Sequence, residues 1–348
     1  MTGTEQVQLE KVIVHKVGNP TRGEQLALSM MPLTFNDELV RSMLVKYFLH
    51  SFNEHELFHF THLSEVDMNK VYHYVQAIFN DPASFAPQSA LIAQFLYNKS
   101  THARVKEGEL YIALLHEVPF ENEFVTALGI FKSESKESFL KVFPHGQNFE
   151  LTAEEGININ KLDKGCLVFR TQENDGYRVC VVDQTNKQND AQYWVNDFLQ
   201  VTPVANEYHH TSEFLQLCRE FVTGEMPENF EVTKHEQIDL MHRSLDYFKT
   251  KEQFDYNEFT QEVMHHPQVI EQFAQFKDQY ANAKQVEWDE SFDIDLAAVK
   301  KQGKVFKSIL KLDKNFHIYI HGRQDLIERG FDEAKGKHFY KVYFEQEQ

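Results

Sequence analysis

The chain has 348 residues, of which 42% are hydrophobic and 25% are charged, and its formal net charge is −18. This composition excludes a largely disordered chain and leaves room for two domains. No apolar run is long enough to span a bilayer, and the N-terminus lacks the layout of a secretory signal peptide. We therefore expect a cytoplasmic protein whose three cysteines, Cys166, Cys180 and Cys218, are buried thiols rather than disulfide or zinc ligands.

Residues 1–203 are predicted to form an α+β domain with a mixed sheet and helices. Asn36 or Thr34 is the candidate N-cap of the first helix. The apolar periodicity predicts strands at 11–17, 26–31, 108–118, 125–134, 138–144, 164–170 and 177–184, and helices at 36–52, 67–80, 86–98 and 190–201.

The second part of the chain is predicted to have two regions. Residues 204–286 have the apolar period of helices, and Pro267 is expected to open one of them. Residues 287–348 are predicted to form a small basic region with a helix over 296–311. A strand over 315–322 is expected to follow and to pair with 338–344.

His55-Glu56-Leu57-Phe58-His59 fits the H-E-x-x-H motif of zinc peptidases. On a helix, His55 and His59 would share one zinc ion and Glu56 would act as the general base. On a strand, the two histidines stand about 13 Å apart. The sequence 57–63 alternates like a strand, and no third histidine follows at metzincin spacing. We therefore expect loop or strand histidines, no bound metal and no other cofactor, with the zinc site as an alternative.

Basic residues gather near the C-terminus. Residues 300–341 contain 11 Lys and Arg but only 5 Asp and Glu, whereas the rest of the chain contains 24 basic and 48 acidic residues. This asymmetry indicates contact with a polyanion, or docking of the segment on an acidic protein surface. On the predicted helix, Lys300, Lys304, Lys307 and Lys311 fall on one outer row. The candidate DNA-binding residues are these four with Lys301, Lys314 and Arg323.

The order of several apolar and aromatic stretches resembles the bacterial nucleoid-associated protein family of the NdpA-like type. The stretches that carry the resemblance are VIVHKV, LALSMMPLTFNDELVRSMLVKYFLHSF, EGELYIALL, LGIFKSE, GININKLDKGCLVF, YWVNDFLQV, SFDIDLAAVKKQGKVFKSILKLDKNFHIYIHG and KHFYKVYF. The resemblance implies a protein of the bacterial nucleoid that binds DNA and has no shared catalytic motif.

Three functions follow as hypotheses. The first is a non-enzymatic protein that binds double-stranded DNA with low sequence specificity through the basic C-terminal patch. The second is a zinc-dependent hydrolase that uses His55, Glu56 and His59. The third is an adaptor that brings other nucleoid proteins together without much DNA affinity of its own. None of the three involves a membrane.

Overall fold

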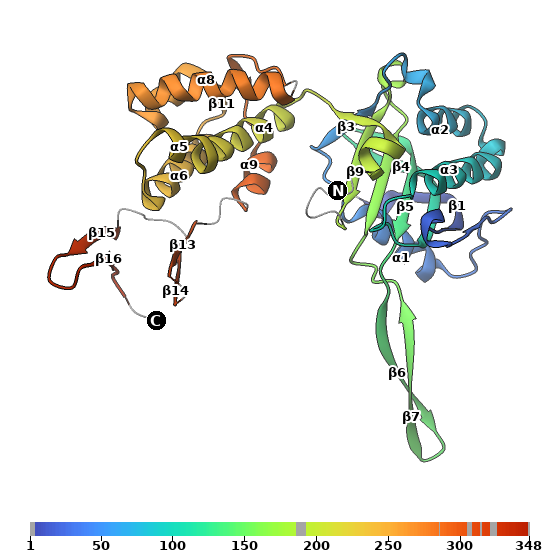
Figure 1. Cartoon of the computed structure of the whole chain (residues 1–348). Coiled ribbons are helices and arrows are strands. Elements are labelled where there is room, and N and C mark those ends of the chain that lie inside the picture. Colours follow the sequence, from blue (N-terminus) through green and yellow to red (C-terminus); the bar gives the residue numbers. More distant parts are fainter. Residues whose placement is uncertain are drawn as a thin grey trace. The chain divides into compact units, whose positions relative to one another are not determined.

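The computed structural model describes residues 4–185, 193–284, 286–304, 308–313, 315–320 and 326–346. The chain divides into two compact units, Met1–Val204 and Ala205–Gln348. The first unit is built around a large sheet with helices beside it, and the second is mainly helical (Figure 1). The predicted α+β class is confirmed.

An eight-stranded sheet forms the centre of the first unit, in the order β10-β3-β9-β8-β5-β4-β1-β2. All seven neighbouring pairs are antiparallel. The prediction of a mixed sheet is therefore wrong. Short connections join β4 to β5 and β8 to β9, and such connections suit only antiparallel neighbours. The strands are β1 (Gln8–Val17), β2 (Leu26–Ala27), β3 (Leu57–Phe60), β4 (Gly108–Phe120), β5 (Glu123–Ser133), β8 (Lys164–Phe169), β9 (Arg178–Asp183) and β10 (Val201–Pro203).

The two faces of the sheet contribute to two apolar cores. Successive side chains of a strand point to opposite faces, so Ile112 of β4 joins one core and Ala113 the other. The first core includes residues of α2 (Lys70–Asn80), α3 (Phe85–Lys99) and the π-helical turn η6 (Tyr193–Leu199). The second includes the end of α1 (Glu38–Leu49).

Helix α1 differs from its prediction at both ends. Its N-cap is Asp37, whose side chain accepts a hydrogen bond from the Leu39 N–H, rather than Asn36 or Thr34. Its only buried residues are in the last turn, at Tyr47, Phe48 and Leu49. The ring of Phe48 stacks on Phe131 of β5 with 4.3 Å between centroids. Only the C-terminal end of the predicted apolar stripe is therefore in the core.

The strand predicted at 138–144 leaves the sheet. It is β6 (Glu137–His145), which pairs only with β7 (Asn148–Gly156), a strand that the sequence analysis missed. We call this hairpin, residues 137–156, the arm; Figure 1 shows it extending away from the sheet. Gly146 has a φ of 62° at the first position of the two-residue turn, which fits a type II′ hairpin.

Helices of the second unit enclose a cluster of phenylalanine rings. Phe214 of α4 lies 4.3 Å from Phe254 and 5.2 Å from Phe259, measured between ring centroids. The helix predicted to open at Pro267 is confirmed as α8. The elements are α4 (Glu207–Glu220), η7 (Phe221–Glu225), α5 (Met226–Asn229), α6 (Lys234–Thr250), β11 (Gln253–Asp255), α7 (Tyr256–Phe259), η8 (Thr260–Met264), α8 (Pro267–Lys284) and β12 (Ser291–Asp293).

The predicted helix over 296–311 is wrong in its second half. Helix α9 is Leu296–Gly303, and the chain then forms β13 (Ser308–Leu312), which pairs with β14 (Phe316–Ile320). The segment 338–344 was assigned the wrong partner, because β16 (Lys337–Val342) pairs with β15 (Ile327–Asp332). Gly303 weakens a helix by ~1 kcal/mol relative to alanine. The alternating segment beyond it gains a full ladder of hydrogen bonds with the strand that follows.

The buried position of His15 in β1 leads us to expect that the protein loses stability in acid. The Ser29 N–H donates to His15 Nδ1 at 3.1 Å, so Nε2 carries the proton and donates to Ser89 Oγ at 3.1 Å. Burial lowers the pKa of His15 from 6.5 to about 4. Between these values only the unfolded chain binds the proton, so the free energy of unfolding should fall by about 3 kcal/mol as pH drops from 6.5 to 4.

Urea unfolding at several pH values measures this effect. The His15→Gln variant keeps a neutral donor and acceptor and should lose much of the pH dependence. His145→Gln, at an exposed site in the arm, is the matched control and should behave like the parent. If the free energy of unfolding depends on pH equally in the parent and in His15→Gln, His15 is not the source of the acid effect.

Candidate nucleic-acid interface

The HELFH segment is not helical. His55 and Glu56 lie in a turn, and His59 lies in β3, where it pairs with Thr202 of β10. The expectation of loop or strand histidines is confirmed. His55 and His59 therefore lack the one-turn spacing that places two imidazoles on one zinc ion. No group of three His, Cys, Asp or Glu residues suited to a metal occurs in the part of the chain that the structure describes.

The four lysines predicted to share one helical row do not lie on one helix. Lys300 and Lys301 lie at the end of α9, and Lys304 is its C-cap; all three are exposed. Lys311 belongs to β13, in register with His317 of β14. Lys307, Lys314 and Arg323 lie outside the described residues. The prediction of a continuous lysine stripe is thus wrong, because the helix ends before Lys307.

Helix α9 is fixed to the body of the second unit. The Asp295 carboxylate accepts from the Ala298 N–H at 2.8 Å, and the Asp295 N–H donates to Thr211 Oγ1 of α4 at 3.1 Å. Val299 is buried, and Gln302 Nε2 donates to Ser212 Oγ at 2.7 Å. The lysine-bearing C-terminal end of the helix is therefore held on an ordered support. Its dipole favours cations there, so the lysines also suit the helix itself.

The hairpin β13–β14 adds exposed side chains that the sequence analysis missed. Leu312 and Ile318 pack with Ile238 of α6, which anchors one face of the hairpin. His317 and Tyr319 alternate with Ile318 and are exposed. Aromatic side chains of this kind can stack on the bases of single-stranded nucleic acid without sequence preference. The alternation in residues 316–320 correctly indicated a strand. Its partner strand was missed because residues 308–311 were assigned to the predicted helix.

The hairpin β15–β16 carries basic residues that already have acidic neighbours. Lys341 Nζ lies 3.8 Å from Glu328 Oε2, and Lys335 Nζ lies 3.6 Å from Asp332 Oδ2. These pairs are exposed, so each contributes little to stability. They nevertheless lower the positive charge that this hairpin presents. The lysines at the end of α9 are exposed, and Lys301 Nζ lies 5.9 Å from the centroid of the Tyr208 ring.

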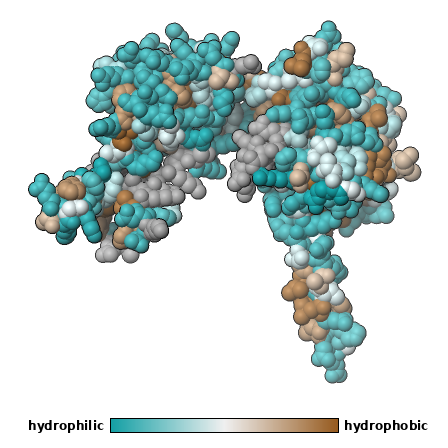
Figure 2. All heavy atoms as spheres, in the orientation of Figure 1, coloured by the Kyte–Doolittle hydropathy of each residue, from teal (hydrophilic) through white to brown (hydrophobic). Residues whose placement is uncertain are grey.

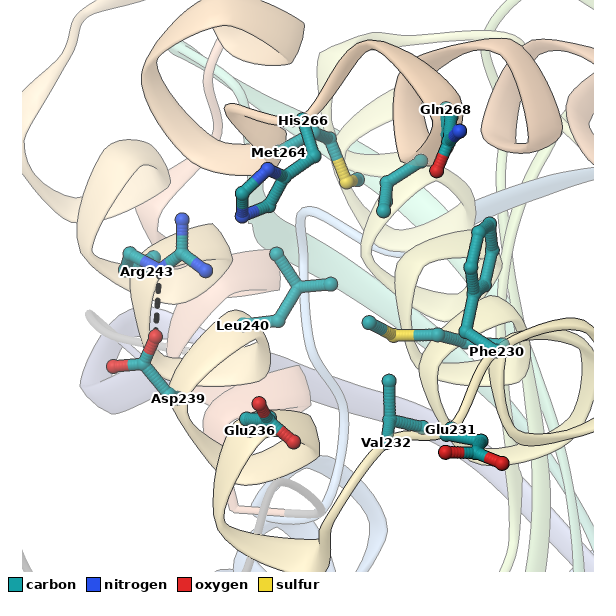
Figure 3. Close-up of a pocket in the computed structure, with 12 residues that line it drawn as sticks. Phe230, Glu231, Val232, Glu236, Asp239, Leu240, Arg243, Met264, His266 and Gln268 are labelled. Atoms are coloured by element: carbon teal, nitrogen blue, oxygen red, sulfur yellow. Dashed lines mark hydrogen bonds and ion pairs between the residues drawn. The ribbon is translucent and has the colours of Figure 1, made fainter.

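A pocket of about 480 Å³ lies in the helical unit but does not suit nucleic acid (Figure 3). Its apolar lining includes Met226, Leu240, Met264 and Val269, and its acidic lining includes Glu231, Glu236 and Asp239. Arg243 donates to Asp239 at 2.9 Å and to the Val263 carbonyl, and Glu236 forms a capping box with Thr233. The acidic lining would repel phosphate, and Glu236, Asp239 and Arg243 already have structural partners.

Two lysines are buried beside acidic residues in the first unit. Lys132 Nζ lies 2.9 Å from Glu134 Oε1 and donates to the Lys106 carbonyl at 2.7 Å. Burial lowers the pKa of Lys132, and the Glu134 carboxylate opposes that shift. Lys164 Nζ donates to Asp183 Oδ1 at 2.6 Å. These groups are paired inside the protein and are not available to an outside phosphate, so their role is structural.

Comparison with known protein families assigns the chain to one of them. The model of the family described as nucleoid-associated protein YejK matches residues 13–335. The chain belongs to this family. The match covers the sheet except the first half of β1, together with the arm, the helical unit and the basic residues from Lys300 to Arg323. No curated protein matches the chain. Among the described residues, no helix has the length and apolar character needed to cross a membrane.

The strand context of HELFH predicts that zinc does not stabilise this nucleoid-associated protein. A metal that binds the folded state alone raises the melting temperature by mass action. We expect the melting temperature in differential scanning fluorimetry to be the same with EDTA and with equimolar zinc. The melting temperature of the His59→Ala variant should also be the same with EDTA and with zinc. A zinc-dependent rise in the parent that His59→Ala abolishes would revive the hydrolase hypothesis.

Proposed function

We propose that this nucleoid-associated protein binds double-stranded DNA directly, without catalysis, through the basic residues of its C-terminal segment. The observation that carries the proposal is the exposed group Lys300, Lys301 and Lys304 at the end of the anchored helix α9. Lys307, Lys311, Lys314 and Arg323 extend the proposed contact along the chain. The place of action is the nucleoid in the bacterial cytoplasm, as the family description supports.

Charge limits where DNA can touch the protein. Outside residues 300–341 the chain carries a net charge of −24, and this charge repels phosphate. Contact is therefore confined to the basic segment. Its affinity comes from the release of counterions as lysines neutralise phosphates, so it depends strongly on salt.

The proposed contact has low sequence specificity. Lysine presents a compact charge on a flexible stem, which suits phosphate better than the edge of a particular base. Helix α9 has only eight residues, and its lysines cluster at its C-terminal end. Recognition helices of DNA-binding proteins instead place several side chains along the major groove. The proposed contact therefore follows the backbone of the duplex.

A second candidate function is an adaptor role. The pocket between α5, α6 and α8 combines an apolar lining that includes Met226 and Met264 with the acidic residues Glu231, Glu236 and Asp239. Such a surface suits a basic amphipathic peptide better than a nucleic acid. In this case the protein would reach DNA through a bound partner. The two functions differ in whether the purified protein binds DNA by itself.

The charge-reversal variant Lys300→Glu/Lys301→Glu/Lys304→Glu tests the proposed function. Each phosphate contact contributes about −0.9 to the slope of log K against log salt. Loss of three contacts should therefore flatten the slope by about 2 to 3 and weaken binding at least tenfold. Fluorescence anisotropy with a labelled random-sequence duplex across a salt series measures both quantities.

The matched control reverses three exposed lysines elsewhere. Lys16→Glu/Lys70→Glu/Lys249→Glu changes the net charge by the same amount, and these residues lie in β1, α2 and α6. The control should retain most of the binding and the parent's slope. If both variants bind like the parent, the patch is wrong. If the parent does not bind DNA at all, the adaptor function is favoured.

A further inference from the structure

The arm is firmly attached at its base. The Asp163 carboxylate is buried and accepts hydrogen bonds from the Glu134 N–H at 2.7 Å, the Ser135 N–H at 2.8 Å and Ser135 Oγ at 3.0 Å. Asn158 Nδ2 donates to the Glu137 carboxylate at 3.0 Å. The segments that enter and leave the arm are thus joined to each other and to the sheet, so the arm projects from a fixed base.

The register of β6 and β7 collects apolar residues on one face. Residues directly opposite each other in an antiparallel pair share a face, and alternate pairs share the same one. The pairs Leu140–Ala153, Val142–Leu151 and Pro144–Phe149 therefore lie on one side of the ribbon. We call these six residues the apolar face. It has no charged residue along these three successive pairs.

The opposite face of the arm is suited to water. Its pairs include Lys141–Thr152, Phe143–Glu150 and Phe139–Glu154. Lys141 Nζ lies 3.2 Å from Glu154 Oε1, and His145 lies 3.6 Å from Glu150. Charged groups thus alternate with Phe139 and Phe143 on this side. The unequal division of charge between the two faces indicates that the apolar face is the one better adapted to another protein surface.

The apolar face is exposed in the single chain. The exposed fractions are 71% for Leu140, 60% for Val142, 74% for Phe149 and 62% for Leu151. Figure 2 shows hydrophobic atoms gathered partway along the projecting arm. An isolated two-stranded hairpin is marginally stable in water, so an exposed apolar ribbon of this length gains stability from a partner.

We propose that the apolar face is a self-association surface, on which the arms of two copies of this chain pack against each other about a two-fold axis. A patch with no charge is complementary to itself, as an isologous contact requires. Two such ribbons can stack face to face at ~10 Å, the spacing of packed sheets. The opposite, charged faces then remain in water.

The available area fits a second copy. With ~150–250 Å² for a fully buried aromatic side chain and less for Leu and Val, the four exposed side chains offer roughly 500 Å² per arm. Two arms together bury roughly 1,000 Å², the lower limit for a specific interface. DNA does not fit this surface, because the apolar face has no lysine or arginine and the arm carries Glu137, Glu150, Glu154 and Glu155 against Lys141.

Sedimentation velocity of the full chain tests the proposal. The parent should be a dimer at micromolar concentration, and Val142→Asp/Leu151→Asp on the apolar face should weaken the dimer at least about 100-fold. The matched control is Asn148→Asp/Thr152→Asp, which adds the same charge to the opposite face of the same hairpin. The control should remain a dimer. A monomeric parent, or an apolar-face variant that stays dimeric, overturns the proposal.

Cross-linking provides a second measurement that does not disturb the arm. The native Cys166, Cys180 and Cys218 are buried, so a short bismaleimide should leave the parent uncoupled. Val142→Cys should give a covalent dimer, whereas Thr152→Cys on the opposite face should not. Equal cross-linking of the two variants also overturns the arm-to-arm contact.

Discussion

The central strands of the sheet leave no place for another strand, and the form of the first unit depends on this constraint. β5 pairs with β4 on one side and with β8 on the other, so both of its edges have their hydrogen bonds. All six residues of β8 are buried, which means that both faces are covered. The residues of β6 and β7, which lie between β5 and β8 in the chain, join neither this ladder nor the core. They can satisfy their backbone groups only by pairing with each other outside the sheet, and the arm is the result.

Buried polar groups hold the point where the arm leaves the sheet. Asp163 fixes the turn after β5, and Lys132 and Glu134 form an ion pair with almost no exposed surface. Removing one partner of such a pair leaves a buried charge uncompensated and is strongly destabilising. The paired residues therefore specify the direction of the chain at this point.

A dimer formed through the arms would also carry two basic segments in one particle, which raises avidity for a long polymer such as DNA.

The uneven distribution of charge shapes the proposed contact with DNA. A protein with an acidic body and a short basic segment cannot coat DNA through its whole surface. Helix α9 presents its lysines from a support that is packed against α4 and α6, while the pocket of the same unit has an acidic lining. The structure thus separates an exposed basic surface from an acidic one.

The sequence by itself determined the features that rest on local patterns. Helical periodicity predicted α2 and α3, Pro267 opened α8, and the strand-like alternation of LFHF argued correctly against a helical zinc motif. The order of the apolar stretches was enough to indicate the family. Tertiary structure alone decided the antiparallel order of the sheet, the departure of β6 from it and the formation of a strand by residues 308–311, which were predicted to be helical. Strand pairing depends on partners that are distant in the sequence, so a short stretch of sequence does not reveal it. The helical period can be recognised within a few turns of the helix itself.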